Sequence, residues 1–201
     1  MNRNVLVFIG IVVTVSVVTS FVLQFLRNSK QNHFMMLLQN NEFDQLYKEL
    51  NSFYVKTIFP YYNREYIRLN ALMLQGNKEA INKQFEILIP MTTGKKARKD
   101  ILNKAFEYYV FEQDKECCDP IFKMIKEFGD EEFTKNASVL YDIFILKKSN
   151  HIEEFEKGFE NLDKFNKVTI ATLLIEQYKN KGDLEKAQYY ETLSKNIVEG
   201  K

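Results

Sequence analysis

The chain has 201 residues, with 28 Lys and Arg against 27 Asp and Glu, so its net charge is +1. This balance excludes a general nucleic-acid binder, because such a protein needs a basic surface to displace phosphate counterions. Only 7 glycines and 3 prolines accompany 17 phenylalanines and 11 tyrosines, which favours long helices packed through bulky side chains.

The first predicted element is a membrane-spanning helix. After a short tail, residues 1–4, the chain runs from Val5 to Leu26 for 22 residues without a charge. At about 1.5 Å per residue this run is roughly 33 Å long, which matches the hydrocarbon core of a bilayer. A cleaved signal peptide is the competing interpretation, but the run is long for one and no Ala-x-Ala-like site closes it. We therefore expect a single-pass protein of the cell membrane. Basic residues flank the run on both sides, so the side that carries the rest of the chain stays open.

Beyond the run, the polar residues 27–32 leave two possibilities. No proline or glycine occurs between Gly10 and the turn-like pair Asn40-Asn41, so the helix can continue to Leu38. Alternatively, the polar stretch breaks the helix and separates the anchor from the rest of the chain.

Residues 27–199 are predicted to form about five helical hairpins. Turn-like pairs recur at Asn40-Asn41, Gly76-Asn77, Gln113-Asp114, Ser149-Asn150 and Gly182-Asp183, and their second members are 36, 37, 36 and 33 residues apart. A nearly constant period in the mid-thirties is typical of stacked helical hairpins. Helices are expected at 43–50, 61–75, 78–89, 99–111, 118–128, 134–146, 152–165, 167–179 and 184–198. Pro90 should close one of them, and Pro120 should lie in the first turn of another.

The last hairpin resembles a tetratricopeptide repeat. Leu174, Tyr178, the Gly182-Asp183 turn and Ala187 follow the order of large apolar, aromatic, turn and small residues in that family. The second and third units match in part, at Leu72, Gly76, Asn77, Ile81, Phe85 and Leu88 and at Tyr109, Asp114, Cys118, Phe122 and Ile125. The first and fourth units lie one residue out of register. The resemblance covers about residues 29–199 and implies an all-α, TPR-like α-solenoid behind the transmembrane helix.

The resemblance also implies a concave groove, lined by the first helix of each hairpin, for a helix or an extended peptide. The family's groove pattern places there Tyr66, Asn70, Met73 and Leu74 from the second unit, Asn103, Glu107, Val110 and Phe111 from the third, and Val139, Ile143 and Leu146 from the fourth. Asn70 matches an amide with which some members hold a peptide backbone. The cations that clamp a terminal carboxylate in chaperone-binding members do not occur at the matching positions. The alternative is that many of these side chains belong to the core between repeats.

Catalytic motifs are not found. His33 and His151 lie far apart and outside any metal-ligand pattern, and no nucleophile or phosphate-binding signature occurs. Cys117 and Cys118 are adjacent, so they point about 100° apart on a helix, with Cys118 expected inside and Cys117 more exposed. A redox pair is the alternative. The sequence thus predicts no enzyme activity, no cofactor, no metal and no small-molecule substrate.

Two functions are expected. The first is a non-enzymatic, membrane-anchored scaffold that binds an unidentified protein partner in the groove, helped by its local concentration at the bilayer. The second is an accessory subunit of a membrane machine for secretion, envelope assembly or quality control. There the spanning helix would itself be an interface, through Ser16 and Ser20 on one face. The richness in Lys, Asn and Ile is typical of an AT-rich, bacterial genome.

Overall fold

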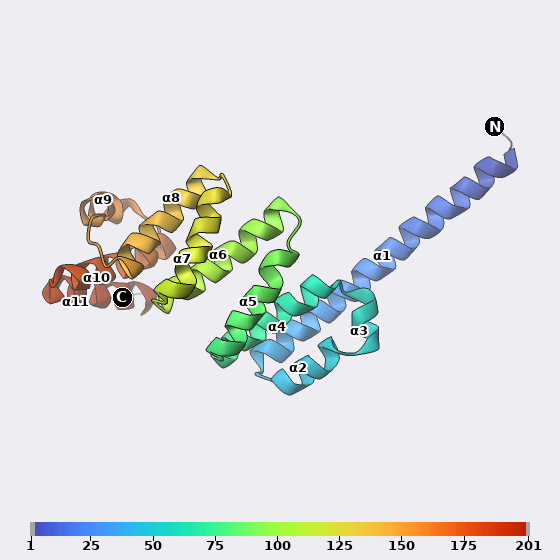
Figure 1. Ribbon diagram of the computed structural model, residues 1–201, viewed down its shortest axis with the longest axis horizontal. Coiled ribbons are helices and arrows are strands. Elements are labelled where there is room, and N and C mark those ends of the chain that lie inside the picture. The colour runs from blue at the N-terminus through green and yellow to red at the C-terminus, as the bar shows by residue number, and fades with distance from the viewer. Residues whose placement is uncertain (1–2, 200–201) are drawn as a thin grey trace. The chain divides into compact units, whose positions relative to one another are not determined.

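The computed structural model describes the backbone of residues 3–199 and the side chains of residues 18–199 (Figure 1). Every element within this range is a helix and no strand occurs among these residues, which confirms the all-α class. The chain divides into two compact units, Met1–Thr93 and Gly94–Lys201. The predicted domain 27–199 therefore includes parts of both units.

The first helix, α1, is unbroken from Arg3 to Gln39. The continuous alternative is therefore confirmed, and a break within residues 27–32 is wrong. Most of the predicted run Val5–Leu26 lies outside the residues whose side chains are described. Within the described part of the chain, no helix reaches the length and hydrophobicity that crossing a membrane requires.

The remaining helices of unit 1 are α2 (Phe43–Leu50), α3 (Phe53–Ile58), α4 (Tyr61–Gln75) and α5 (Lys78–Met91). The end of α1 packs against α2, α3 and α4, and α4 packs against α5. Their apolar faces enclose one core, made of Phe34, Leu37, Leu38, Leu46, Leu50, Val55, Ile58, Phe59 and Ala71. α2 and α4 begin and end where the sequence predicts.

Helix α3 was not predicted from the sequence. Ser52 begins this short helix, because its hydroxyl accepts a hydrogen bond from the Val55 backbone N–H at 3.3 Å. The helix ends at Ile58, since Pro60 forces the preceding residue, Phe59, into an extended conformation.

Unit 2 begins with α6 (Lys95–Phe111), α7 (Lys115–Glu127) and α8 (Glu131–Leu140), and α8 runs directly into a π-helical segment, η1 (Tyr141–Ile145). α9 (Ile152–Gly158), a short 3₁₀ turn, α10 (Lys164–Lys181) and α11 (Leu184–Glu199) come next. α6 packs against α7, α7 against α8, and α10 against α9 and α11. The last three helices share a core of Ile152, Phe159, Ala171, Leu174, Tyr178, Ala187 and Tyr190.

Two prolines lie deeper inside helices than predicted. Pro90 lies within α5, in its last turn, instead of closing it, and Pro120 is the sixth residue of α7 instead of lying in its first turn. Each leaves one carbonyl, four residues earlier, without its helical hydrogen bond. Both prolines are exposed, as are Glu86 and Glu116 at those earlier positions, so water reaches the unpaired carbonyls.

The predicted helix 152–165 is wrong at its end. The chain leaves the helical conformation at Leu162, and Asp163 starts α10 by accepting hydrogen bonds from the backbone N–H groups of Phe165 and Asn166. The predicted helix 134–146 is likewise α8 followed by the π-helical segment η1.

The hairpin turns repeat at a period in the mid-thirties, as predicted. Among the described residues, five of the six left-handed backbone positions lie in these turns, Asn41, Gly76, Gln113, Lys147 and Gly182, at successive distances of 35, 37, 34 and 35 residues. The sixth, Gly129, lies in the turn between α7 and α8. After three of the five hairpin turns the next helix is capped by a side chain, of Asn77, Asp114 or Asp183, which accepts from a backbone N–H three residues on. The fourth connection runs from Leu146 to His151, so it includes both the left-handed Lys147 and the predicted pair Ser149-Asn150.

Candidate functional site

The first four groove candidates lie on one face of α4. Tyr66, Asn70 and Met73 are half-buried, and Leu74 is exposed to 60%. The spacing of four and then three or four residues places them on one side of the helix. Leu69, one helical turn from both Tyr66 and Met73, is buried, so the strip lies at the edge of the buried face of α4. α4 thus presents a partly apolar strip that includes the amide of Asn70.

The other candidates lie on unit 2 and divide into surface and core. Glu107, Phe111 and Leu146 are exposed, and Asn103 and Val139 are half-buried. The Asn103 amide donates to Glu107 at 2.9 Å, and the Phe111 ring packs edge-on against Phe144 with centroids 5.3 Å apart.

Two candidates are core residues. Val110 and Ile143 are 0% exposed, so they have no surface to offer a ligand. These two residues belong to the core between helices, which is the alternative that the sequence left open. The candidate surface of unit 2 is therefore limited to the exposed and half-buried residues of α6, α8 and the turn after η1.

Glu65, Arg68 and Gln84 form a partly buried polar network next to the α4 strip. This network was not predicted from the sequence. Glu65 is buried, and its carboxylate accepts from Arg68 Nε at 3.0 Å and from Gln84 Nε2 at 2.9 Å. The Arg68 guanidinium also donates to Asn51 at 3.1 Å and lies over the ring of Tyr47. These contacts hold α4 against α2 and α5, which fixes the orientation of the strip.

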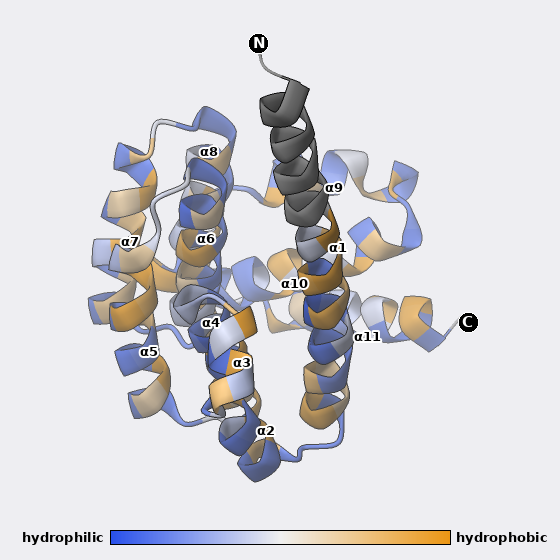
Figure 2. Ribbon diagram, turned by 90° about the vertical axis from the view of Figure 1, so that its right-hand side faces the viewer, coloured by the Kyte–Doolittle hydropathy of each residue, from blue (hydrophilic) through white to orange (hydrophobic). Residues whose placement is uncertain are grey.

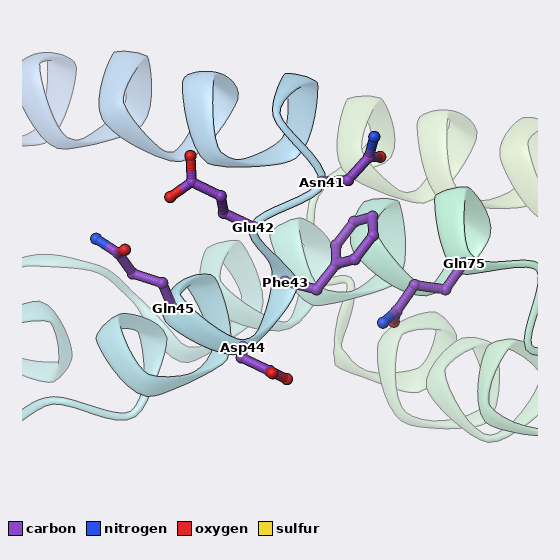
Figure 3. A pocket seen from close by; sticks show the side chains of 6 residues that line it. All are labelled: Asn41, Glu42, Phe43, Asp44, Gln45 and Gln75. Carbon is purple, nitrogen blue, oxygen red and sulfur yellow. The ribbon is translucent and has the colours of Figure 1, made fainter.

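A shallow pocket of about 440 Å³ lies where the turn after α1 meets the end of α4. Its lining is acidic and amide-rich: Asn41, Glu42, Phe43, Asp44, Gln45 and Gln75. Figure 3 shows the Phe43 ring lying between the Asn41 and Gln75 side chains. The lining combines two carboxylates with an apolar ring, a composition that suits a cationic side chain of a partner. None of these residues was a groove candidate.

A cluster of charges joins α1 to α2. The Glu49 carboxylate accepts from Lys30 at 2.8 Å and lies 2.9 Å from His33 Nε2, and Gln45 donates to it at 3.2 Å. Burial alone raises the pKa of Glu49, but the hydrogen bonds from Lys30, His33 and Gln45 outweigh it and lower the pKa to about 2.

We expect this cluster to make unit 1 sensitive to acid. The folded pKa of Glu49 lies below its ordinary value of 4.5, so its contribution to stability is complete above pH 4.5 and is lost as the pH falls toward 2. Glu49→Gln should therefore flatten the pH dependence of unit 1 unfolding within that window, measured by urea denaturation. Glu86→Gln, at an exposed position on α5, is the control and should leave the pH profile unchanged. Equal profiles for the wild type and Glu49→Gln would contradict the assignment.

A second carboxylate joins the three last helices. Glu156 of α9 accepts from the hydroxyls of Tyr178 of α10 at 2.6 Å and Tyr190 of α11 at 2.9 Å, and the two rings stack. The Tyr178 hydrogen bond lowers the pKa of Glu156, while burial and the Glu156 carboxylate raise the pKa of Tyr178 to about 12. Tyr178 was recognised in the sequence only as a repeat aromatic, and Glu156 was not recognised.

The cysteines occupy the positions that the sequence predicts. Cys118 is fully buried, whereas Cys117 is partly exposed, and neither forms a disulfide bond. Burial raises the pKa of Cys118 to about 12. Its thiolate, the reactive form, is therefore scarce at neutral pH.

We expect one fast-reacting thiol in the folded protein. Cys117→Ser should remove most of the rapid reaction with a thiol reagent at neutral pH, and Cys118→Ala should leave it intact. Mass spectrometry of the labelled chain distinguishes the two positions, and urea-unfolded protein, in which both thiols react, is the reference. Rapid labelling of Cys118 in the folded state would contradict its buried position.

The two histidines pair with carboxylates in separate units. His33 contacts Glu49, and His151 lies 3.8 Å from Asp142 and 3.6 Å from Glu154. Among residues 18–199, no group of three or more His, Cys, Asp and Glu side chains is arranged to hold a metal ion.

One exposed face of α1 ahead of the unit 1 core is apolar. Phe21 and Phe25 are each 73% exposed, and Val18 and Val22 are also exposed. On the same stretch Leu23 and Leu26 pack against the core of unit 1. Large apolar side chains exposed side by side on one element mark a surface that another apolar phase or molecule covers.

Comparisons with protein-family models, with curated proteins and with solved structures find no match to this chain.

Proposed function

We propose that this chain is a non-enzymatic scaffold anchored in the cell membrane by Val5–Leu26, whose helical units bind another protein. The observation that carries the anchor is the exposed apolar stretch of α1. This stretch is the described end of the uncharged run, it lies within one unbroken helix, and that helix ends as part of the unit 1 core. A large apolar surface of this kind favours lipid over water.

The finer architecture is a TPR-like α-solenoid. Two observations support this proposal: the period of 34 to 37 residues between the left-handed residues of the five hairpin turns, and the packing of α4 with α5, α6 with α7 and α10 with α11 as pairs. Ala187, at the small-residue position of the last pair, is buried together with Tyr178, as close packing of α10 and α11 requires.

The proposed binding surface is the α4 strip, Tyr66, Asn70, Met73 and Leu74, with Phe111 and its neighbours as a second surface on unit 2. Apolar side chains spaced by a helical turn, with an amide among them, suit a helix or an extended peptide. The network of Glu65, Arg68 and Gln84 supports this proposal, since it holds α4 in one orientation before a ligand arrives.

Site-specific cross-linking tests this function. A photoreactive residue at Leu74 of the full chain, in its native membrane, should give an adduct with a defined protein, and Leu74→Asp should abolish co-purification of that protein. Lys83, exposed on α5, is the matched control position and should give no such adduct. The same adducts at both positions, or none at Leu74, would overturn the strip as a binding surface.

The second candidate is an accessory subunit of a membrane machine for secretion, envelope assembly or quality control, with α1 as the interface. Ser20 is exposed on α1, and Ser16 lies outside the residues whose side chains are described. Replacing both by leucine should abolish co-purification of a partner if α1 is the interface, and leave it intact if α1 serves only as an anchor.

The side of the membrane is decided by labelling intact cells with an impermeant thiol reagent. Cys117 and an added cysteine at Lys195, an exposed position on α11, report the location of unit 2. Labelling before permeabilisation places it outside the cell, and labelling only afterwards places it in the cytoplasm.

A further inference from the structure

The other helices of unit 1 first contact α1 at the point where the apolar run ends. Leu23 and Leu26, in the last turn of the run, pack against the unit 1 core. The next residue, Arg27, donates from Nε to the backbone carbonyl of Ile58, at the end of α3, at 2.6 Å. A helix rises about 1.5 Å per residue, so Leu23 lies only about 5 Å inside the end of the run. Unit 1 is thus joined to the run without a spacer.

α3 and the start of α4 are the parts of unit 1 nearest to the run. Figure 1 shows α3 on the side of unit 1 toward the amino-terminal half of α1, and Figure 2, turned by 90°, presents this side to the viewer. Tyr61 begins α4 just beyond Ile58. The other end of α4, at Gln75, lines the pocket beside Asn41, past the far end of α1. α4 therefore runs away from the apolar run, with Tyr61 at its near end.

Three aromatic side chains are exposed on these nearest parts. Phe53 is 87% exposed, and Tyr54 and Tyr61 are each about half exposed. Lys56, on the same short helix, is exposed as well. Phenylalanine and tyrosine rings with a nearby lysine are the residues that settle at the boundary between lipid and water, because the rings enter the headgroup region while the hydroxyls and the ammonium stay hydrated.

We propose that Phe53, Tyr54 and Tyr61 insert into the headgroup region of the bilayer that holds α1. Lipid is the occupant because these side chains lie on α3 and the first residue of α4, and α3 ends at Ile58, which accepts a hydrogen bond from Arg27, the residue that follows the run. If the run spans a bilayer, these side chains lie near the surface of that bilayer without any movement of unit 1. The inference rests on the proposed anchor and deepens it: unit 1 is held against the membrane in one orientation, which sets the height at which the α4 strip meets a partner.

Tryptophan fluorescence tests the inference, since the chain has no tryptophan of its own. Single variants Phe21→Trp, Phe53→Trp and Leu74→Trp of the full chain are reconstituted in phosphatidylcholine–phosphatidylglycerol vesicles that carry spin-labelled lipid. All three positions are exposed, so the substitutions leave the core intact. A headgroup label should quench Phe53→Trp several-fold more strongly than Leu74→Trp, and a label deep in the acyl chain should quench Phe21→Trp most.

Comparing the three tryptophan positions distinguishes failure of the membrane anchor from failure of the contact between unit 1 and lipid. Phe21→Trp without quenching would overturn the membrane anchor, and this inference with it. Phe21→Trp quenched, with Phe53→Trp no more quenched than Leu74→Trp, would overturn only the contact of unit 1 with the lipid. A blue-shifted but unquenched Phe53→Trp would mean that protein, such as a second copy of the chain, covers the aromatic surface, and would also overturn the inference.

Discussion

Phe34→Ala should lower the free energy of unfolding of unit 1 by about 3–5 kcal/mol, the range for removing a buried phenylalanine. Phe34 is 1% exposed on α1, and its ring centroid lies 5.7 Å from that of Phe59. The variant leaves a cavity between α1 and the helices that follow it. Because Phe34 belongs to the same helix as the proposed anchor, the change should also loosen the attachment of unit 1 to α1. Hydrogen exchange of the backbone amides of residues 43–50 measures both effects.

Met36→Ala is the matched control, since Met36 lies two residues further along α1 and is exposed. Its effect should stay within about 0.5 kcal/mol, as for most surface substitutions. If the two variants destabilised unit 1 equally, the end of α1 would not be part of its core.

Arg68→Ala should destabilise unit 1 by about 2–3 kcal/mol. Removing one partner of a buried ion pair typically costs about 3–5 kcal/mol, because the other charge remains buried and unpaired. Water can reach the Arg68 side chain, which is 22% exposed, so the expected cost lies below that range. The Glu65 carboxylate keeps only the Gln84 amide, and α4 loses its link to Asn51. Urea denaturation measures the change, and partner binding through Leu74 should weaken with it.

A double variant separates the lost charge from lost packing. Glu65→Leu with Arg68→Leu removes both charges and keeps the volume, so it should be less destabilised than Arg68→Ala alone. Lys83→Ala is the surface control. Its pair with Glu79, at 2.7 Å, is solvent-exposed on both sides, and its loss should change little. A double variant as unstable as Arg68→Ala would mean that packing by the arginine stem, and not charge pairing, stabilises α4.

Much of the helical pattern could be predicted because its signals are local. Gly76-Asn77 and Gly182-Asp183 combine a residue that tolerates a left-handed backbone with one that caps the next helix, and the structure places helix ends at both. Gln113 adopts the same left-handed backbone without being glycine, and the period made that turn predictable. The π-helical segment η1 has no such local signal, and an ordinary helix was predicted through it.

The sequence by itself determined the all-α class, the period of the turns and the uncharged run Val5–Leu26, because each depends on residues close together in the chain. Only the tertiary structure decided that Val110 and Ile143 are core while Leu74 and Phe111 face solvent. It also brought Gln84 to Glu65, 19 residues away, and Ile58 to Arg27, 31 residues away. Such contacts depend on which faces of separate helices meet, and helical periodicity alone does not specify the partner of a face.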